Sequence, residues 1–278
     1  YKGANPQQAI EKLEQLKAVD PSSVQADKKL AEVYYMNNRF DKAAEAYARF
    51  IDTPEATEND LVKYAFALFL NHDFEKSLEV ANMGLKKNAR HAAFNRLAMY
   101  NYTDLKRFDE AIKAADAFFT ESDKADYSYL DYMYYGHLLE ALKKYDEAVG
   151  QYEKAVELDP TKTDLYKNIS SAYEQKNDYK KAIGAYHKYY SSLEKEKQTP
   201  DLQFQLGRLY YGAGTQPDSL TINAEERKQA LMSADSVFQV ISEAAPDSYL
   251  GNFWRARANS ALDPETTQGL AKPFYEEV

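Results

Sequence analysis

Apolar and polar positions recur along this chain with a period near 34 residues. Each period holds two stretches in which apolar side chains fall at helical spacing, so each stretch predicts an amphipathic helix. The second stretch opens on an aromatic residue, and a small residue follows three positions later. These pairs are Phe40 with Ala43, Phe74 with Ser77, Phe108 with Ala111, Tyr145 with Ala148, and Tyr179 with Ala182, and their small residues are 34, 34, 37 and 34 positions apart. The pattern predicts an all-α protein built from helical hairpins.

The small residue has a packing role, because it lets the second helix of a hairpin approach the first helix closely. Another ring follows four positions later, on the same helix face, at Tyr47, Tyr152 and Tyr186. Ala81 and Ala115 stand there in two other hairpins. In those two hairpins we expect closer packing, or side chains from elsewhere that fill the space.

The period divides the whole chain into repeats, and we expect a single array over residues 1–278. The predicted repeats are residues 24–57, 58–91, 92–127, 129–162, 163–198 and 200–247. The sixth repeat has an insertion at 212–224, after which Asn223 and Glu226 form a capping-box pattern that starts the next helix. Residues 1–22 match a second helix without its partner, and residues 248–278 match an incomplete last repeat. These ends suggest a fragment of a longer array.

The segment 132–160 resembles the tetratricopeptide repeat nearly throughout. The matching residues are Tyr132, Tyr135, Gly136, Leu139, Ala148, Tyr152 and Pro160. The resemblance implies a right-handed superhelical solenoid of helix-turn-helix repeats, whose first helices line a concave groove for a peptide or helix of a partner protein. It also implies a protein-binding scaffold and not an enzyme.

The amino-acid composition narrows the classes of partner that the chain could bind. The chain has 35 Lys and Arg against 44 Asp and Glu, a formal net charge of −9, and no Cys. Nucleic acids and anionic membrane surfaces attract basic proteins, so this balance disfavours both. No apolar run approaches the roughly 20 residues that span a bilayer, which predicts that the chain does not insert into a membrane. Without Cys there are no disulfides, thiolate nucleophiles or Cys-based zinc sites.

Catalytic and cofactor motifs are missing from the sequence. The four His are scattered and lack the spacing of zinc peptidases. The segment Gly212-Ala213-Gly214 lacks the following Gly and Lys of a phosphate loop. We therefore expect no catalytic residue, no cofactor and no metal.

Positions counted from the small residue of each first helix predict the side chains that line the groove. In the first three repeats they are Lys28, Tyr35, Lys63, Phe66, Phe69, Arg96 and Tyr100. In the next three they are Met133, Tyr134, His137, Lys167, Glu174, Phe204, Arg208 and Tyr211, and Phe253 and Arg257 join them from the last repeat. Aromatic and Arg side chains often dominate binding energy, although many of these rings could instead pack against the next hairpin. The Lys-and-Asn clamp of tetratricopeptide co-chaperones is absent, because Glu32 follows Lys28 and Ser171 follows Lys167.

Three functional hypotheses remain open. The chain is a scaffold for partner proteins, a module that assembles with copies of itself, or an accessory domain of a longer protein with another activity. The insertion at 212–224 is either a functional loop or a tolerated surface excursion. Tyr richness and the segments 253–257 and 269–273 resemble extracytoplasmic tetratricopeptide proteins of Bacteroidetes. That resemblance favours the periplasm, with the cytoplasm left open.

Overall fold

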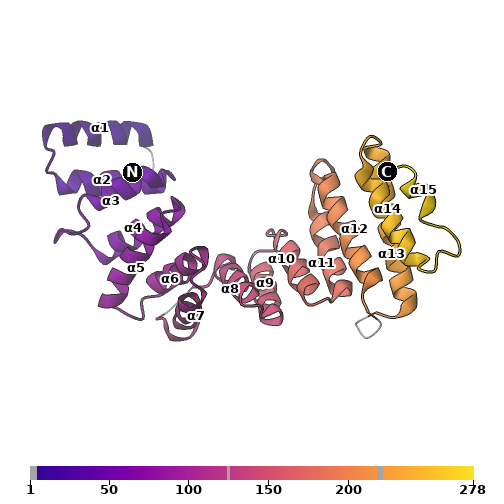
Figure 1. Cartoon of the computed structure of the whole chain (residues 1–278). Coiled ribbons are helices and arrows are strands. Elements are labelled where there is room, and N and C mark those ends of the chain that lie inside the picture. The colour runs from indigo at the N-terminus through magenta and orange to yellow at the C-terminus, as the bar shows by residue number, and fades with distance from the viewer. Residues whose placement is uncertain (1–4, 124–125, 218–221) are drawn as a thin grey trace. The chain divides into compact units, whose positions relative to one another are not determined.

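The computed structural model describes residues 5–123, 126–217 and 222–278, and within these ranges it contains helices and no strand. The all-α prediction is therefore confirmed for this part of the chain (Figure 1). In residues 1–127 the helices are α1 (Pro6–Val19), α2 (Val24–Met36), α3 (Phe40–Ala48), α4 (Glu58–Leu70), α5 (Phe74–Lys87), α6 (Ala92–Asp104), α7 (Phe108–Asp116) and the π-helix η1 (Ala117–Glu121). In residues 128–278 they are α8 (Tyr129–Ala141), α9 (Tyr145–Leu158), α10 (Leu165–Gln175), α11 (Tyr179–Ser192), the 3₁₀-helix η2 (Lys195–Lys197), α12 (Pro200–Thr215), α13 (Ala224–Ala244), α14 (Tyr249–Leu262) and α15 (Lys272–Tyr275).

The turn between the two helices of a hairpin has the same backbone geometry five times. One residue in each turn adopts a left-handed conformation with φ between 57° and 61°: Asn38, His72, Lys106, Lys143 and Asn177. The next amide then donates to a carbonyl five residues earlier, at 2.8–2.9 Å in all five turns. This bond is the closure of a Schellman motif, which satisfies the last carbonyls of the first helix. The backbone therefore sets the length and direction of each hairpin turn in the same way.

The predicted close approach of the two helices is confirmed by burial. Each small residue of the repeated pattern is 0% exposed, from Ala43 to Ala182. The rings four positions later are equally enclosed, since Tyr47 and Tyr152 are 0% exposed and Tyr186 is 2% exposed. Small residues and rings thus form the inner seam of the hairpins.

In the α5 hairpin, where Ala81 stands in place of the ring, a side chain from the following helix packs against α5. Phe94 of α6 is fully buried and lies against Gly84 of α5. A Cβ at Gly84 would come within 2.2 Å of the Phe94 ring. A ring one helix later in the chain therefore packs on α5 three positions after Ala81.

The chain divides into an N-terminal unit of residues 1–127 and a C-terminal unit of residues 128–278. Within each unit, the second helix of one hairpin packs against the first helix of the next hairpin, as α3 does on α4 and α9 does on α10. The core is therefore a series of local layers. Helix burial in such an array comes from the nearest neighbours in sequence.

Two segments complete the C-terminal unit. Residues 212–215, which we placed in the insertion, are the last turn of α12, and residues 218–221 of that insertion lie outside the described residues. The capping box of Asn223 and Glu226 is confirmed at the start of α13. No helix in the described ranges is long and apolar enough to cross a membrane.

Candidate functional site

Hydrogen bonds join the first helices α8 and α10 of the C-terminal unit side to side. The amide nitrogen of Asn168 lies 2.8 Å from Nε2 of His137, and the hydroxyl of Ser171 donates to Glu140 at 3.0 Å. Glu140 also accepts a 2.7 Å hydrogen bond from the hydroxyl of Tyr152, which burial and the adjacent carboxylate keep protonated by raising its pKa. The predicted residue His137 therefore belongs to a polar network between two repeats.

Contacts between first helices continue from α10 to α12 and from α12 to α14. Glu174 of α10 forms an ion pair with Arg208 of α12 at 3.9 Å, so two predicted groove residues are partners. From α12 to α14 the contact is aromatic: the rings of Phe204 and Tyr211 lie 5.6 and 5.3 Å from that of Trp254. These contacts hold successive first helices in a defined register.

Arg257 of α14 is the most unusual cation on this face. Its guanidinium lies 4.5 Å from the Trp254 ring centre, 5.0 Å from that of Tyr211 and 5.9 Å from that of Phe253. Within the described ranges no carboxylate forms an ion pair with it. Three rings therefore orient a cation whose charge is not neutralised by an acidic side chain.

In the N-terminal unit, the predicted cation Lys28 also bridges two first helices. Its amino group lies 2.7 Å from a carboxylate oxygen of Asp60, whose side chain is 2% exposed. Asp60 is also part of the capping box of α4, with Thr57. Burial alone would raise the pKa of Asp60, but hydrogen bonds from Lys28 and Thr57 outweigh it and hold that pKa below its usual value. Lys28 therefore has a structural partner.

Burial separates the predicted groove residues into two classes. Tyr100 is 1% exposed and Phe69 is 8% exposed, and their rings pack 5.5 Å apart between α4 and α6. These two belong to the core and present almost no surface to a ligand. Arg96 is half-buried, with its guanidinium 5.0 Å from the Phe118 ring centre and 2.6 Å from the carbonyl of Asp126.

The remaining predicted residues keep accessible surface. Lys167 and Arg208 are exposed, and the half-buried ones are Tyr35, Lys63, Phe66, Met133, Tyr134, His137, Glu174, Phe204, Tyr211, Phe253 and Arg257. Sequence spacing cannot separate these from Tyr100, because both classes share a helix face and differ only in what the next hairpin covers. Within the described ranges no group of three or more His, Asp or Glu side chains could hold a metal ion.

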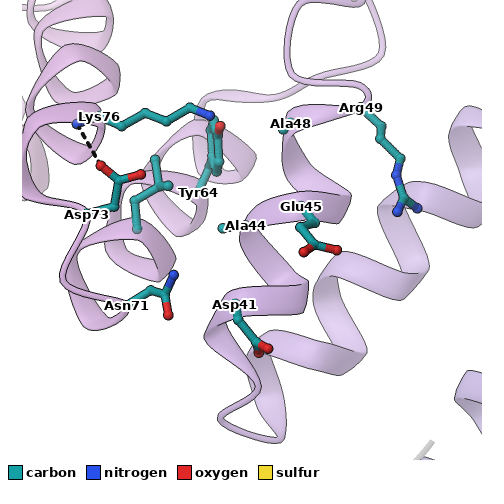
Figure 2. Close-up of a pocket in the computed structure, with 10 residues that line it drawn as sticks. Asp41, Ala44, Glu45, Ala48, Arg49, Tyr64, Asn71, Asp73 and Lys76 are labelled. Atoms are coloured by element: carbon teal, nitrogen blue, oxygen red, sulfur yellow. Dashed lines mark hydrogen bonds between the residues drawn. The ribbon is translucent and has the colours of Figure 1, made fainter.

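A cleft that the sequence did not indicate lies in the N-terminal unit, between α3, α4 and the start of α5 (Figure 2). It has a volume of about 440 Å³. Ala44 and Ala48 of α3 face Tyr64 of α4 across it (Figure 2), and Leu68 of α4 also lines it. The sequence feature that accompanies it is the small size of Ala44, since the other second helices carry larger residues at that position.

Comparisons with known proteins place this architecture in context. Models described as tetratricopeptide repeat match residues 1–59 and residues 130–162. The crystal structure of the C-terminal part of a TPR repeat-containing protein from Cytophaga hutchinsonii, a member of the Bacteroidetes, is similar, with 30% identity and a TM-score of 0.58. The similarity covers 78% of this chain and 77% of that one.

Two further solved structures share the fold alone. MamA (41-end) from Desulfovibrio magneticus RS-1 has 16% identity and a TM-score of 0.54, over 63% of this chain and 97% of that one. Another MamA structure has 18% identity and a TM-score of 0.51, over 62% and 93%. A comparison with curated proteins gave no match.

Proposed function

Because the chain belongs to the tetratricopeptide repeat family, we propose that it is a scaffold that binds a peptide or helical segment of a partner protein on its first helices. In this proposal the binding surface of the C-terminal unit is the face of α8, α10, α12 and α14. Stacked repeats present such faces as extended binding surfaces. The same residues that join the helices then shape the surface that the partner meets.

The observation that carries this proposal is the environment of Arg257. A guanidinium held against Trp254 and Tyr211 loses little conformational freedom when it binds, so less of the interaction energy is lost to ordering. Arg, Trp and Tyr are also the residues most enriched among energetic hot spots of protein interfaces. An acidic or polar group of a partner is the complement that this cation lacks among the residues that the structure describes.

Other cations on the same face extend the surface. Lys167 is exposed, and the side chain of Arg208 is 45% exposed although it touches Glu174. An ion pair as long and as open as this one contributes about 0–1 kcal/mol, so a partner carboxylate can compete for Arg208 at little cost. We therefore infer a partner segment with apolar anchors and some acidic groups.

The test is affinity capture from a lysate of the source organism, read by mass spectrometry. The baits are the wild-type chain, a variant with Lys167→Ala, Arg208→Ala and Arg257→Ala, and a matched control with Lys228→Ala and Met232→Ala on the exposed side of α13. Circular dichroism checks that all three baits keep their helices. We expect a partner that the wild type and the control retain and that the triple variant loses.

Two outcomes would contradict the proposal. Retention of the same partners by all three baits would place binding away from the first helices. Recovery of the chain alone would favour the alternative of self-assembly, which a concentration series in light scattering would then detect as a rise in mass. Tyr100 is unsuitable for such a variant, because its removal would open a cavity in the core.

A further inference from the structure

The last two first helices carry the same two side chains at equivalent positions. In α12, Phe204 is followed four positions later by Arg208, and in α14, Phe253 is followed four positions later by Arg257. None of the five earlier first helices has an arginine or lysine at the position of these two. Their residues there are Glu32, Phe66, Tyr100, His137 and Ser171. The repeated pair of phenylalanine and arginine is therefore particular to α12 and α14.

Burial shows that the two arginine positions are equivalent in space as well as in sequence. The residue before each arginine is small and buried, and it is Gly207 in α12 and Ala256 in α14. The residue after each arginine is buried too, since Leu209 is 1% exposed and Ala258 is 0% exposed. Both helices thus turn the same positions inward. The two arginines therefore occupy the same place on the first-helix face of successive repeats.

One aromatic ring lies between the two arginines. Tyr211 follows Arg208 by three positions, so the two side chains are neighbours on the surface of α12. The Tyr211 ring centre lies 5.0 Å from the guanidinium of Arg257. Packed helices lie about 8–10 Å apart, which sets the spacing of the two guanidiniums at about the same value.

Among the described residues, only one of the two arginines has an ion-pair partner. Glu174 of α10 lies 3.9 Å from Arg208, and no carboxylate pairs with Arg257. The Arg208 side chain remains 45% exposed in this contact, and Arg257 is half-buried. A ligand can therefore reach both guanidiniums. Two like charges held on adjacent helices also favour an anion that neutralises them.

We propose that Arg208 and Arg257 form a two-point site for an extended acidic segment of a partner protein, in which two carboxylates stand three residues apart. The proposal rests on the proposed function of the first-helix face, and it adds the sequence chemistry of the partner. A polyproline II segment has three residues per turn and rises about 3.1 Å per residue, so side chains i and i+3 lie on one side, about 9 Å apart. That distance matches the spacing of the two guanidiniums. One carboxylate pairs with Arg208 and the other with Arg257.

The rings beside the arginines favour an extended chain over a helix. Phe204, Tyr211 and Phe253 are half-buried, so a ligand must come close to the backbones of α12 and α14 to contact them. An α-helix with its side chains is about 10–12 Å wide, which is wider than the spacing of about 8–10 Å between packed helices. An extended backbone is narrower. An apolar side chain between the two acidic residues then contacts these rings.

The test uses the full chain and two peptides of the same composition. The first probe is acetyl-Pro-Asp-Pro-Leu-Asp-Pro-amide, whose aspartates are three residues apart. The matched control is acetyl-Pro-Leu-Asp-Asp-Pro-Pro-amide, whose aspartates are adjacent. Calorimetry measures both dissociation constants. We expect the first probe to bind about threefold to fivefold more tightly, because only it reaches both arginines.

Fluorescence locates the binding. Trp254 is the single tryptophan of the chain, and its ring centre lies 4.5 Å from the guanidinium of Arg257. Binding of a carboxylate to Arg257 should therefore change the emission of Trp254, with the same dissociation constant that calorimetry gives.

Single substitutions separate the two contacts. Arg208→Ala and Arg257→Ala should each abolish the preference for the first probe. Because Arg208 is exposed, its variant tests the site even if Arg257→Ala, which loses contacts with three rings, folds poorly. Lys228→Ala removes an exposed cation of α13 and should keep the full preference, which controls for the change in net charge.

Glu174→Gln provides a gain of affinity that a folding defect does not produce. It removes the carboxylate that competes for Arg208, so the first probe should bind about twofold to fivefold more tightly. The matched control is Glu157→Gln on the exposed side of α9, which removes the same charge and should leave the dissociation constant unchanged.

Equal affinity of the wild type for the two peptides would overturn the proposal. A preference that survives in both arginine variants, an unchanged affinity in Glu174→Gln, or binding without a change in Trp254 emission would do the same. These results are independent of the capture experiment. If the triple variant loses a captured partner while the two peptides bind equally, the first-helix face binds the partner and the spacing of its acidic residues is wrong.

Discussion

Replacing Gly136 with alanine tests the packing of α8 on α9. A Cβ at this position would lie 2.4 and 2.6 Å from two atoms of the Tyr152 ring, distances that require the ring to move. Tyr152 is 0% exposed, and its hydroxyl is tied to Glu140 by a 2.7 Å hydrogen bond. Over-packing of this kind costs about 1–3 kcal/mol. The gain in helix propensity from glycine to alanine returns only about 0.5–1 kcal/mol.

Gly150 in α9 provides a matched control, because nothing lies within 4 Å of a Cβ built there. Gly150→Ala should therefore gain the propensity term alone and stabilise the protein by about 0.5–1 kcal/mol. Since both substitutions share that term, the difference between the two variants isolates the packing cost of about 1–3 kcal/mol.

Urea denaturation followed by circular dichroism measures the free energy of unfolding of each variant. Tryptophan fluorescence from Trp254 gives a second probe of whether unfolding is cooperative, which arrays of repeats do not always satisfy. If Gly136→Ala proves as stable as Gly150→Ala, the Tyr152 ring does not lie as close to Gly136 as the structure indicates. The packing reason for a glycine at position 136 would then also be wrong.

Three further substitutions test other contacts. Lys28→Met should destabilise the protein by about 1.5–3 kcal/mol in urea denaturation, because Asp60 then keeps a buried charge without its cation. Since the folded pKa of Asp60 is lowered, its contribution is present above its unfolded pKa near 3.8 and is lost as the pH falls through the lower folded pKa. Titration should show this loss beginning at a higher pH in Lys28→Met. Ser77→Ala removes the acceptor of a buried 2.8 Å hydrogen bond from Asn101 and the donor of a second 2.8 Å hydrogen bond to the Ala65 carbonyl, and it should cost about 1–3 kcal/mol. The double change with Asn101→Leu should recover the part of that loss that comes from the unpaired Asn101 amide, and full additivity in a double-mutant cycle would argue against the Ser77–Asn101 pair. Tyr100→Ala should cost about 3–5 kcal/mol in thermal or urea unfolding, and a near-neutral result would mean that this ring is not in the core.

The hairpins could be predicted because their signals are local. A small residue three positions after a ring, with polar residues before it, is enough to indicate a second helix and its turn. The structure adds that Asn38 and its four equivalents share a left-handed backbone. Lys106 and Lys143 adopt the same left-handed conformation, which asparagine adopts more readily than lysine. Residue type alone would therefore not have identified those two turns.

The candidate site was predicted less completely, because surface and core share one helix face. Tyr100 and Tyr134 both fall on the predicted inner face, yet Tyr100 is buried against Phe69 and Tyr134 keeps accessible surface. The deciding factor is the neighbouring hairpin, which a count along one helix does not include. The cleft at Ala44 was missed for a related reason, since an alanine in a helix looks neutral until the residues opposite it are known.

The sequence by itself determined the helices, their pairing into hairpins and the resemblance to tetratricopeptide repeats, because these depend on spacing within about 34 residues. Only the tertiary structure decided which side chains are free to bind. Lys28 and Glu174 look like groove residues in the sequence and are partners of Asp60 and Arg208 in the fold. Such pairs join residues from successive repeats, so they depend on how one hairpin packs on the next.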